Sequence, residues 1–133
     1  MLYEIWDVKP RKSCGPLVFG MGFSEVIERL DNADYTVFKR FEDDEFDEYI
    51  FQEIGVFLKF DEQFLLNYIA LFRPNNGMLE GISLLDRPTT DVRHDLVCAK
   101  LPFIDYNNGL WSEELQLLLF AVDGCIDCVE LYP

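Results

Sequence analysis

The sequence feature that most constrains the fold is a sixteen-residue stretch that occurs twice, first as 15–30 and again as 81–96. The two copies, GPLVFGMGFSEVIERL and GISLLDRPTTDVRHDL, align without a gap at a constant spacing of 66 residues. A second match follows at a spacing of 60, and it pairs Phe60 with Phe120. Repetition at a fixed spacing is typical of one supersecondary unit used twice. Chance is the competing explanation, because leucine, valine and glycine are common residues.

The length and composition of the chain allow a packed interior. Of the 133 residues, 50% are apolar and 15% are aromatic, which is enough for one domain or for two small halves that share a core. No stretch approaches the roughly 18 consecutive apolar residues of a membrane span. The first twelve residues mix acidic, apolar and basic side chains, whereas a signal peptide has a separate apolar core. We therefore expect a cytoplasmic protein that does not enter a membrane.

Net charge is the strongest global signal for the kind of partner. Eleven basic and 25 acidic side chains give a formal charge of −14 at pH 7. A protein this acidic is repelled by nucleic acid and by anionic membranes, and it is attracted to basic protein surfaces. The expected partner is therefore a basic protein. The competing interpretation is an acidic surface that only keeps the protein soluble.

Helix and strand patterns follow one another in the same order in both halves of the chain. An apolar stripe at helical spacing predicts a helix over 23–30, and a second helix is predicted over 91–99. Apolar runs and alternating patterns predict extended segments, which cover 2–8, 35–41, 49–51, 56–60, 64–72, 102–106, 115–122 and 125–132. The Pro-Asn-Asn-Gly loop at 74–77 is the expected seam between the halves.

These elements predict an α+β fold made of two repeats. Each repeat has a helix followed by antiparallel strands, and the helices of both repeats pack on one face of a sheet. The first repeat covers 1–74, including the N-terminal strand, and the second covers 75–133. The two repeats form either separate domains or a single compact one.

The sequence offers few groups for catalysis or metal binding. Cys125 and Cys128 have C-x-x-C spacing but lack the second pair of a zinc site, so we expect reduced thiols on opposite faces of one strand. The single histidine, His94, is predicted to face solvent from the second helix. No Walker, dinucleotide-binding, G-x-S-x-G or H-E-x-x-H pattern occurs. We therefore predict a protein that is not an enzyme and that uses neither a metal nor a cofactor.

The sharpest local feature is the run EDDEFDE at 42–48, in which six of seven residues carry a carboxylate. It lacks the ligand spacing and the central glycine of a calcium loop. As a recognition patch, the run would present a negative field to arginines and lysines, and neighbouring aromatic side chains would add contact area. The predicted partner-binding residues are Asp43, Asp44, Glu45, Asp47, Glu48, Tyr49 and Tyr35. The competing interpretation is a solvated loop.

Two pieces of the first half resemble a known helix-plus-sheet unit. Residues 20–30 and the stretch GVFLKFD at 55–61 are similar to the unit of the beta-lactamase inhibitory proteins, and lipoproteins of the SmpA/BamE type use a similar one. The tandem arrangement resembles the inhibitory proteins, and small acidic bacterial immunity proteins have a similar overall look. The lipoproteins tend to carry leucine–glycine and a proline after the helix, whereas here Leu30 is followed by Asp31.

Charge, the acidic run and the resemblance lead to one functional expectation. We expect a non-catalytic protein-binding inhibitor, most concretely an immunity protein that neutralises a cognate bacterial toxin by occluding its basic active site. The alternative is a structural or chaperone-like adaptor of the envelope-assembly type, and an enzyme comes third.

Overall fold

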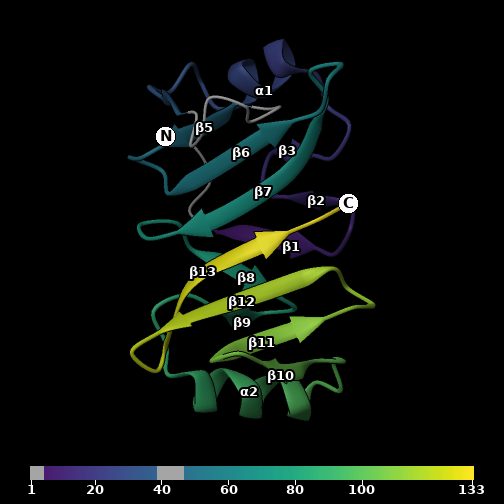
Figure 1. The fold of residues 1–133 in the computed structure, drawn as a ribbon, viewed down its shortest axis with the longest axis vertical. Helices are drawn as coiled ribbons and strands as arrows, with labels where there is room; N and C mark the ends of the chain where they lie inside the picture. Colours follow the sequence, from purple (N-terminus) through teal and green to yellow (C-terminus); the bar gives the residue numbers. More distant parts are fainter. Residues whose placement is uncertain (1–4, 39–46) are drawn as a thin grey trace.

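The computed structural model describes residues 5–38 and 47–133, and in this part of the chain the protein is α+β with two helices and two sheets (Figure 1). The helices are α1 (Phe23–Arg29) and α2 (Thr89–Cys98). The strands are β1 (Trp6–Lys9), β2 (Ser13–Cys14), β3 (Leu17–Val18), β4 (Thr36–Phe38), β5 (Glu48–Phe51), β6 (Val56–Phe60), β7 (Leu66–Phe72), β8 (Gly77–Leu79), β9 (Ile82–Ser83), β10 (Ile104–Tyr106), β11 (Gly109–Ser112), β12 (Leu117–Val122) and β13 (Cys125–Leu131). The predicted helices and strands are confirmed with shifted ends, and β2, β3, β8, β9 and β11 are additional.

The large sheet contains eight antiparallel strands in the order β10–β11–β12–β13–β7–β6–β5–β4. Its centre is the pairing of β7 with β13, whose register places Leu71 opposite Val129. The small sheet has the order β3–β2–β1–β8–β9 and includes a parallel pair, β1 with β8. Both sheets therefore combine strands from before and after the loop at 74–77.

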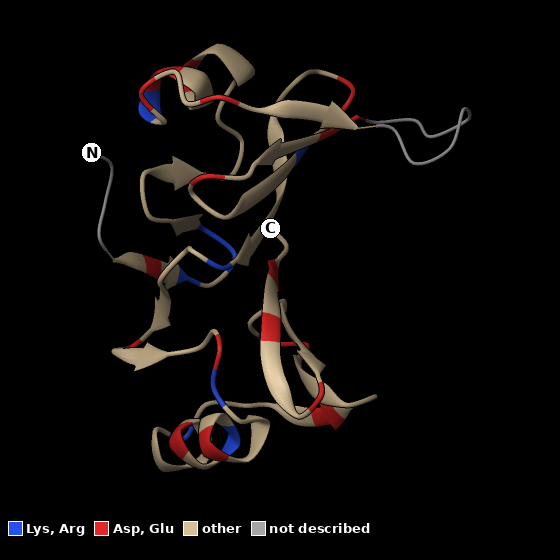
Figure 2. Cartoon of the chain, turned by 90° about the vertical axis from the view of Figure 1, so that its left-hand side faces the viewer, with Lys and Arg blue, Asp and Glu red and all other residues tan. Residues whose placement is uncertain are grey.

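The core lies between the large sheet and the elements that cover it. Both helices and the small sheet lie on the same side of the large sheet (Figure 2). Leu58 and Ile69 of the large sheet, Val26 of α1 and Val92 of α2 are completely buried, and burying such a side chain contributes roughly 1.5–3 kcal/mol. Along β6, buried and half-buried residues alternate, as expected for a strand with one covered face. The other face of the large sheet carries no further helix or strand of the described chain.

Each helix begins at a hydrogen bond to a turn of the large sheet. At the start of α1, Phe23 N donates to Phe64 O in the β6–β7 turn at 3.1 Å. At the start of α2, Thr89 donates from N at 2.8 Å and from Oγ1 at 3.2 Å to Gly124 O in the β12–β13 turn. These bonds satisfy amide groups that a helix start leaves without an intrahelical partner, and they fix the position of each helix on the sheet.

A β-bulge in the β12–β13 pairing changes the face on which the cysteines lie. Ile126 and Val129 are three residues apart and yet both are buried, because the bulge inserts one extra residue between them. Their neighbours Cys125 and Cys128 therefore both lie on the uncovered face of the sheet. The prediction that these cysteines occupy opposite faces is wrong. Both thiols are free in the structure.

Candidate functional site

The candidate site is the uncovered face of the large sheet, which we call the open face. Neighbouring residues in a strand point to opposite sides, so residues between the buried ones point away from the helices. The open face includes Thr36, Phe38, Glu48, Ile50, Phe57, Lys59, Tyr68, Ala70, Phe72, Ile104, Tyr106, Trp111, Leu118, Phe120, Val122, Cys125, Cys128 and Glu130, with Tyr132 directly after β13. Ile104 is 64% exposed, and Tyr106 and Phe120 are each 49% exposed. Large apolar side chains that are exposed together in this way are typical of an interaction surface.

The open face has a first half, formed by β4–β7, and a second half, formed by β10–β13. In the first half, a lysine lies between a carboxylate and a tyrosine ring. Lys59 Nζ lies 3.5 Å from Glu48 Oε1 and 4.9 Å from the ring centroid of Tyr68. The side chain of Glu48 is 6% exposed and that of Lys59 is 38% exposed. The ring of Phe57 contacts the same tyrosine edge-on. A cation of the chain itself therefore interacts with both the carboxylate and the aromatic face.

In the second half of the open face, two tyrosine hydroxyls meet one carboxylate. The hydroxyl of Tyr68 donates to Glu130 Oε1, and the hydroxyl of Tyr132 lies 3.5 Å from the same oxygen. The ring of Trp111 contacts that of Tyr132 at a centroid distance of 6.3 Å. Burial, followed by the charge of Glu130, raises the pKa of Tyr132 to about 12. Burial and the hydrogen bond to Glu130 raise the pKa of Tyr68 as well, so both phenols keep their protons to a higher pH than an ordinary tyrosine does.

Two neighbouring hollows open on this second half. The first has a volume of about 410 Å³ and is lined by Tyr106, Trp111, Gln116, Leu118 and Tyr132. The second, of about 250 Å³, shares Tyr106 and Leu118 with the first and extends to Glu130. Sites for small ligands typically measure about 300–1,000 Å³. Aromatic rings and one carboxylate therefore surround a space large enough for a side chain of a partner.

The predicted acidic patch is described only in part. Asp43, Asp44 and Glu45 lie outside the described residues. Asp47 is half-buried directly before β5. Glu48, the first residue of β5, is buried and forms the ion pair with Lys59. Its carboxylate is therefore engaged within the sheet, and the proposed contact of this run with a partner stays a prediction.

The two predicted aromatic anchors lie together on the covered side of the sheet. The ring centroids of Tyr35 and Tyr49 are 5.8 Å apart, and Phe23 of α1 contacts both rings. Burial, with smaller contributions from Asp47 and Tyr35, raises the pKa of Tyr49. Glu48 and Tyr49 are consecutive in β5, so their side chains point to opposite faces. The predicted set is therefore divided between two surfaces.

Trp111, Tyr132, Tyr106 and Glu130 are not among the binding residues predicted from the sequence. One sequence signal does point to their face. Strand β12 reads LLLFAV and is apolar on both sides, whereas a strand with one solvated face alternates apolar and polar residues. An antiparallel strand of this composition predicts either a second covering layer or a binding surface.

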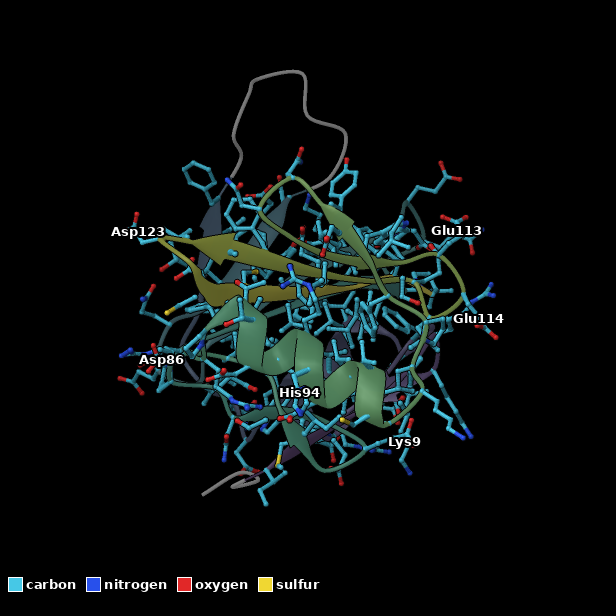
Figure 3. All side chains as sticks on the ribbon, turned by 90° about the horizontal axis from the view of Figure 1, so that it is seen from below. Lys9, Asp86, His94, Glu113, Glu114 and Asp123 are labelled. Atoms are coloured by element: carbon cyan, nitrogen blue, oxygen red, sulfur yellow. The ribbon has the colours of Figure 1, made fainter. Side chains whose placement is uncertain are left out.

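A further pair of polar groups lies on α2. His94 is exposed, as predicted (Figure 3), and its Nε2 lies 3.6 Å from Sγ of the exposed Cys98. Within residues 5–38 and 47–133, no group of three His, Cys, Asp or Glu side chains is placed to hold a metal ion. Neither α1 nor α2 is long and apolar enough to cross a bilayer.

The open face is suited to binding a macromolecule. Exposed aromatic and apolar side chains provide contact area that can be desolvated, and tyrosine and tryptophan add polar ends to that area. No protein-family model, curated protein or solved structure matches the chain. A functional proposal therefore depends on the geometry of the open face.

Proposed function

We propose that the chain is a non-catalytic protein-binding inhibitor, most concretely an immunity protein that neutralises a bacterial toxin by covering its basic active site. The observation that carries this proposal is the open face, where exposed apolar side chains on adjacent strands surround Glu130. Interfaces are enriched in aromatic residues at their centre, and complementary charge speeds association. Occlusion needs only a matching shape and charge, so the chain requires no catalytic group.

The charge of the chain supports a basic partner. The formal net charge is −14, and acidic residues occur on both helices and both sheets (Figure 2). Such a field attracts a cationic surface over a distance of roughly one Debye length, about 8 Å at physiological salt. A toxin that binds nucleic acid or another polyanion has a basic active site for the same reason, so it is a suitable target for this face.

The internal arrangement supports a tandem repeat of one helix-plus-sheet unit, which is the architecture that the resemblance implies. Gly20 N donates to Leu66 O, and Asp86 N, 66 residues further on, donates to Ile126 O. The acceptor is displaced by 60 residues, so both spacings of the sequence repeat recur in one pair of hydrogen bonds. The strands β4–β7 after α1 and β10–β13 after α2 are both antiparallel meanders.

The repeat also accounts for two irregularities. The β6–β7 pairing shifts register between Lys59 and Phe60, and the β12–β13 pairing shifts between Phe120 and Ala121. In both strands, one residue separates the buried leucine, Leu58 or Leu119, from the point at which the register shifts. Bulges at matching positions are expected when two units descend from one sequence, because bulges are retained within families.

The experiment uses the gene directly upstream, because an immunity gene lies beside its toxin gene. The product of that gene is expressed alone and together with this chain. We expect growth arrest in the first case, and restored growth with a stoichiometric complex in the second. An upstream product that is harmless, or an arrest that this chain does not relieve, would contradict the proposal. A complex without any effect on growth would favour the adaptor of the envelope-assembly type.

A matched pair of variants tests whether the open face makes the contact. Phe120→Asp places a charge on the open face, and Val97→Asp places one on α2, where Val97 is 67% exposed. Because the two side chains are similarly accessible, the folding cost should be small for both. We expect Phe120→Asp to lose protection while Val97→Asp keeps it. Equal protection by both variants would exclude the open face.

A third variant tests the acidic run separately. Asp43, Asp44, Glu45 and Asp47 are replaced by lysine, while Glu48 is kept because it forms the ion pair with Lys59. If the run steers association, stopped-flow mixing at low salt should show binding slowed by roughly tenfold or more, with a weaker dependence on salt. Unchanged rates would make the run a solvated loop.

A further inference from the structure

The cavity of about 410 Å³ on the second half of the open face has the composition of a cation site. Three aromatic side chains line it: Tyr106 from β10, Trp111 from β11 and Tyr132 after β13. The rings of Trp111 and Tyr132 lie 6.3 Å apart with their planes at 75°. The two rings therefore contact each other edge to face on the border of one space. Aromatic faces attract ammonium and guanidinium groups within about 6 Å of the ring centroid.

A carboxylate lies directly beside this cavity. Glu130 lines the adjoining hollow, which shares Tyr106 and Leu118 with the first. Its Oε1 accepts a hydrogen bond from Tyr68 and lies 3.5 Å from the hydroxyl of Tyr132. Among the described residues, no lysine or arginine forms an ion pair with Glu130. Within 5–38 and 47–133, the contacts of this half-buried carboxylate are those with the two tyrosine hydroxyls.

The first half of the same face contains the arrangement with its cation in place. There, Lys59 Nζ lies 3.5 Å from the carboxylate of Glu48 and 4.9 Å from the Tyr68 ring centroid. The second half has a carboxylate and aromatic rings as well, but Phe120, opposite Cys128, takes the place of Lys59, opposite Tyr68. The sequence match of Phe120 with Phe60 is therefore wrong by one residue, since Phe60 is buried and Phe120 is exposed. The first half therefore shows a cation bound between a carboxylate and an aromatic ring. In the second half, no cation of the described residues occupies the equivalent position.

We propose that this cavity receives the guanidinium group of an arginine on the basic partner, an inference that rests on the proposed function. Arginine fits better than lysine for two reasons. Its planar group stacks on aromatic rings such as Trp111, and it also donates several hydrogen bonds to a carboxylate such as Glu130. The negative field of the whole chain adds to the attraction. The arginine would act as the central anchor of the interface, since buried arginine and tryptophan are common among residues that dominate binding energy.

The test uses small probes and no toxin, so that its outcome is independent of the proposed function. N-acetyl-arginine amide and N-acetyl-citrulline amide are titrated separately into ¹⁵N-labelled protein. Citrulline has nearly the same shape as arginine and carries no charge. The indole N–H signals of Trp111 and Trp6 are followed, and Trp111→Phe assigns them. Trp6 is 2% exposed and serves as an internal control.

We expect the arginine probe to shift the Trp111 signal in a saturable manner, with a dissociation constant on the order of 1–10 mM for a single side chain. The citrulline probe should bind at least about tenfold more weakly. A third probe, N-acetyl-lysine amide, should have an affinity between those of the other two. Equal responses to the arginine and citrulline probes would overturn the proposal, because the cavity would then not recognise charge.

Two variants locate the charge that is recognised. Glu130→Gln keeps an oxygen acceptor for the hydroxyl of Tyr68 and removes the charge, so it should weaken the arginine probe by about tenfold. The matched control Asp123→Asn also removes one negative charge, from the exposed β12–β13 turn (Figure 3), and it should have no effect. Equal weakening by both variants would overturn the proposal, because only the overall field would then matter.

A second cavity variant covers the case in which Glu130→Gln disturbs the fold. Trp111→Leu keeps an apolar side chain on β11, the strand next to the edge strand β10. The variant should therefore fold, and its circular dichroism spectrum should match that of the wild type. Arginine binding should fall below detection in this variant, as measured from backbone amide shifts of β11 and β12. Retained binding would overturn the proposal. A chain that protects against a toxin but does not bind the arginine probe would disprove the arginine site while leaving the proposed function in place.

Discussion

The two halves of the open face share an arrangement of strands and differ in what they leave available for binding. In the first half, β4–β7, Lys59 of the chain itself contacts Glu48 and the ring of Tyr68. In the second half, β10–β13, the ring of Trp111 borders a cavity of about 410 Å³, and Glu130 lies in the adjoining hollow. The first half supplies its own cation to the carboxylate and the ring, and the second half presents a carboxylate and aromatic rings without a cation from the described residues.

This difference separates the positions that the fold determines from those that it leaves free. Leu58 of β6 and Leu119 of β12 are both completely buried, and both precede a register shift in their strand pair. One residue further along each strand, on the open face, stand Lys59 and Phe120. Packing density constrains the buried position in both halves. The open position is constrained only by what it must contact, which makes it the place where binding specificity can be encoded.

The largest expected effect tests whether the two halves form one cooperative unit. Leu58→Ala and Leu119→Ala should each lower the free energy of unfolding by about 2–5 kcal/mol, because each leaves a cavity in the core. Both variants should unfold in a single transition, since β7 pairs with β13 across the middle of the large sheet. Urea titration, followed by circular dichroism and by tryptophan fluorescence, measures both quantities. Two separate transitions would show that 1–74 and 75–133 are independent domains.

The next effect concerns a turn that both halves form with different residues. Gly55 precedes β6 with a φ of 69°, and Gln116 precedes β12 with a φ of 54°. A Cβ on Gly55 would overlap Phe72 O and approach Asn75 N at 2.7 Å. Gly55→Ala should therefore lower the free energy of unfolding by about 3 kcal/mol, through overlap and left-handed strain. Gln116→Ala should cost less than about 1 kcal/mol, because a Cβ already fits there. Equal costs in thermal or urea unfolding would mean that the two turns are equally crowded.

The fold class and the helices were predictable from the sequence because their signals are local. The stripe that includes Val26 has helical spacing, and both Val26 and Val92 are completely buried. The loop at 74–77 was likewise recognisable from its turn residues. Such patterns depend on the chain within one or two turns, and they do not require knowledge of which strands pair.

The open face was not predictable because its key contacts are long-range. Tyr68 and Glu130 are 62 residues apart in the chain and meet only because β7 pairs with β13. The bulge near Cys128 also escapes a sequence pattern, since one inserted residue reverses every later side-chain direction. An apolar strand such as β12 gives no indication of which of its faces the helices cover.

A moderate effect is expected where the first half binds its own cation. Lys59→Met should lower the free energy of unfolding by about 1–2 kcal/mol, because the buried carboxylate of Glu48 loses its ion pair with Lys59. The loss is limited because the lysine side chain is 38% exposed and partly solvated. The double variant with Glu48→Gln should recover most of it, and Lys59→Arg should remain near the wild type. A double variant as unstable as Lys59→Met alone would place the cost in packing and not in charge.

The smallest effect on stability is expected for Cys98→Ser. The same experiment should show a large difference in reaction rate between Cys98 and Cys128, which lies at the centre of the open face. Burial, followed by the charges of Glu130 and Asp127, raises the pKa of Cys128 from its usual 9 to about 12. Cys98 on α2 is exposed. With a disulfide reagent such as DTNB at pH 8, we expect Cys98 to react in a fast phase and Cys128 at least about 100-fold more slowly, because the thiolate is the nucleophile. Cys98→Ser should remove the fast phase and leave the unfolding curve unchanged.

The raised pKa of Cys128 also predicts how its reaction rate and the stability of the fold change with pH. Because the folded-state pKa of Cys128 lies above its ordinary value, the resulting stabilisation is complete below about pH 9 and is lost as the pH rises towards about 12. The slow phase should therefore accelerate over this interval. A fast phase that disappears in Cys128→Ser would mean that solvent reaches the seam between β13 and β7. The open face would then admit the reagent at the β13–β7 pair, where Cys128 lies opposite Phe72, and the burial of this thiol would be less complete than its raised pKa implies.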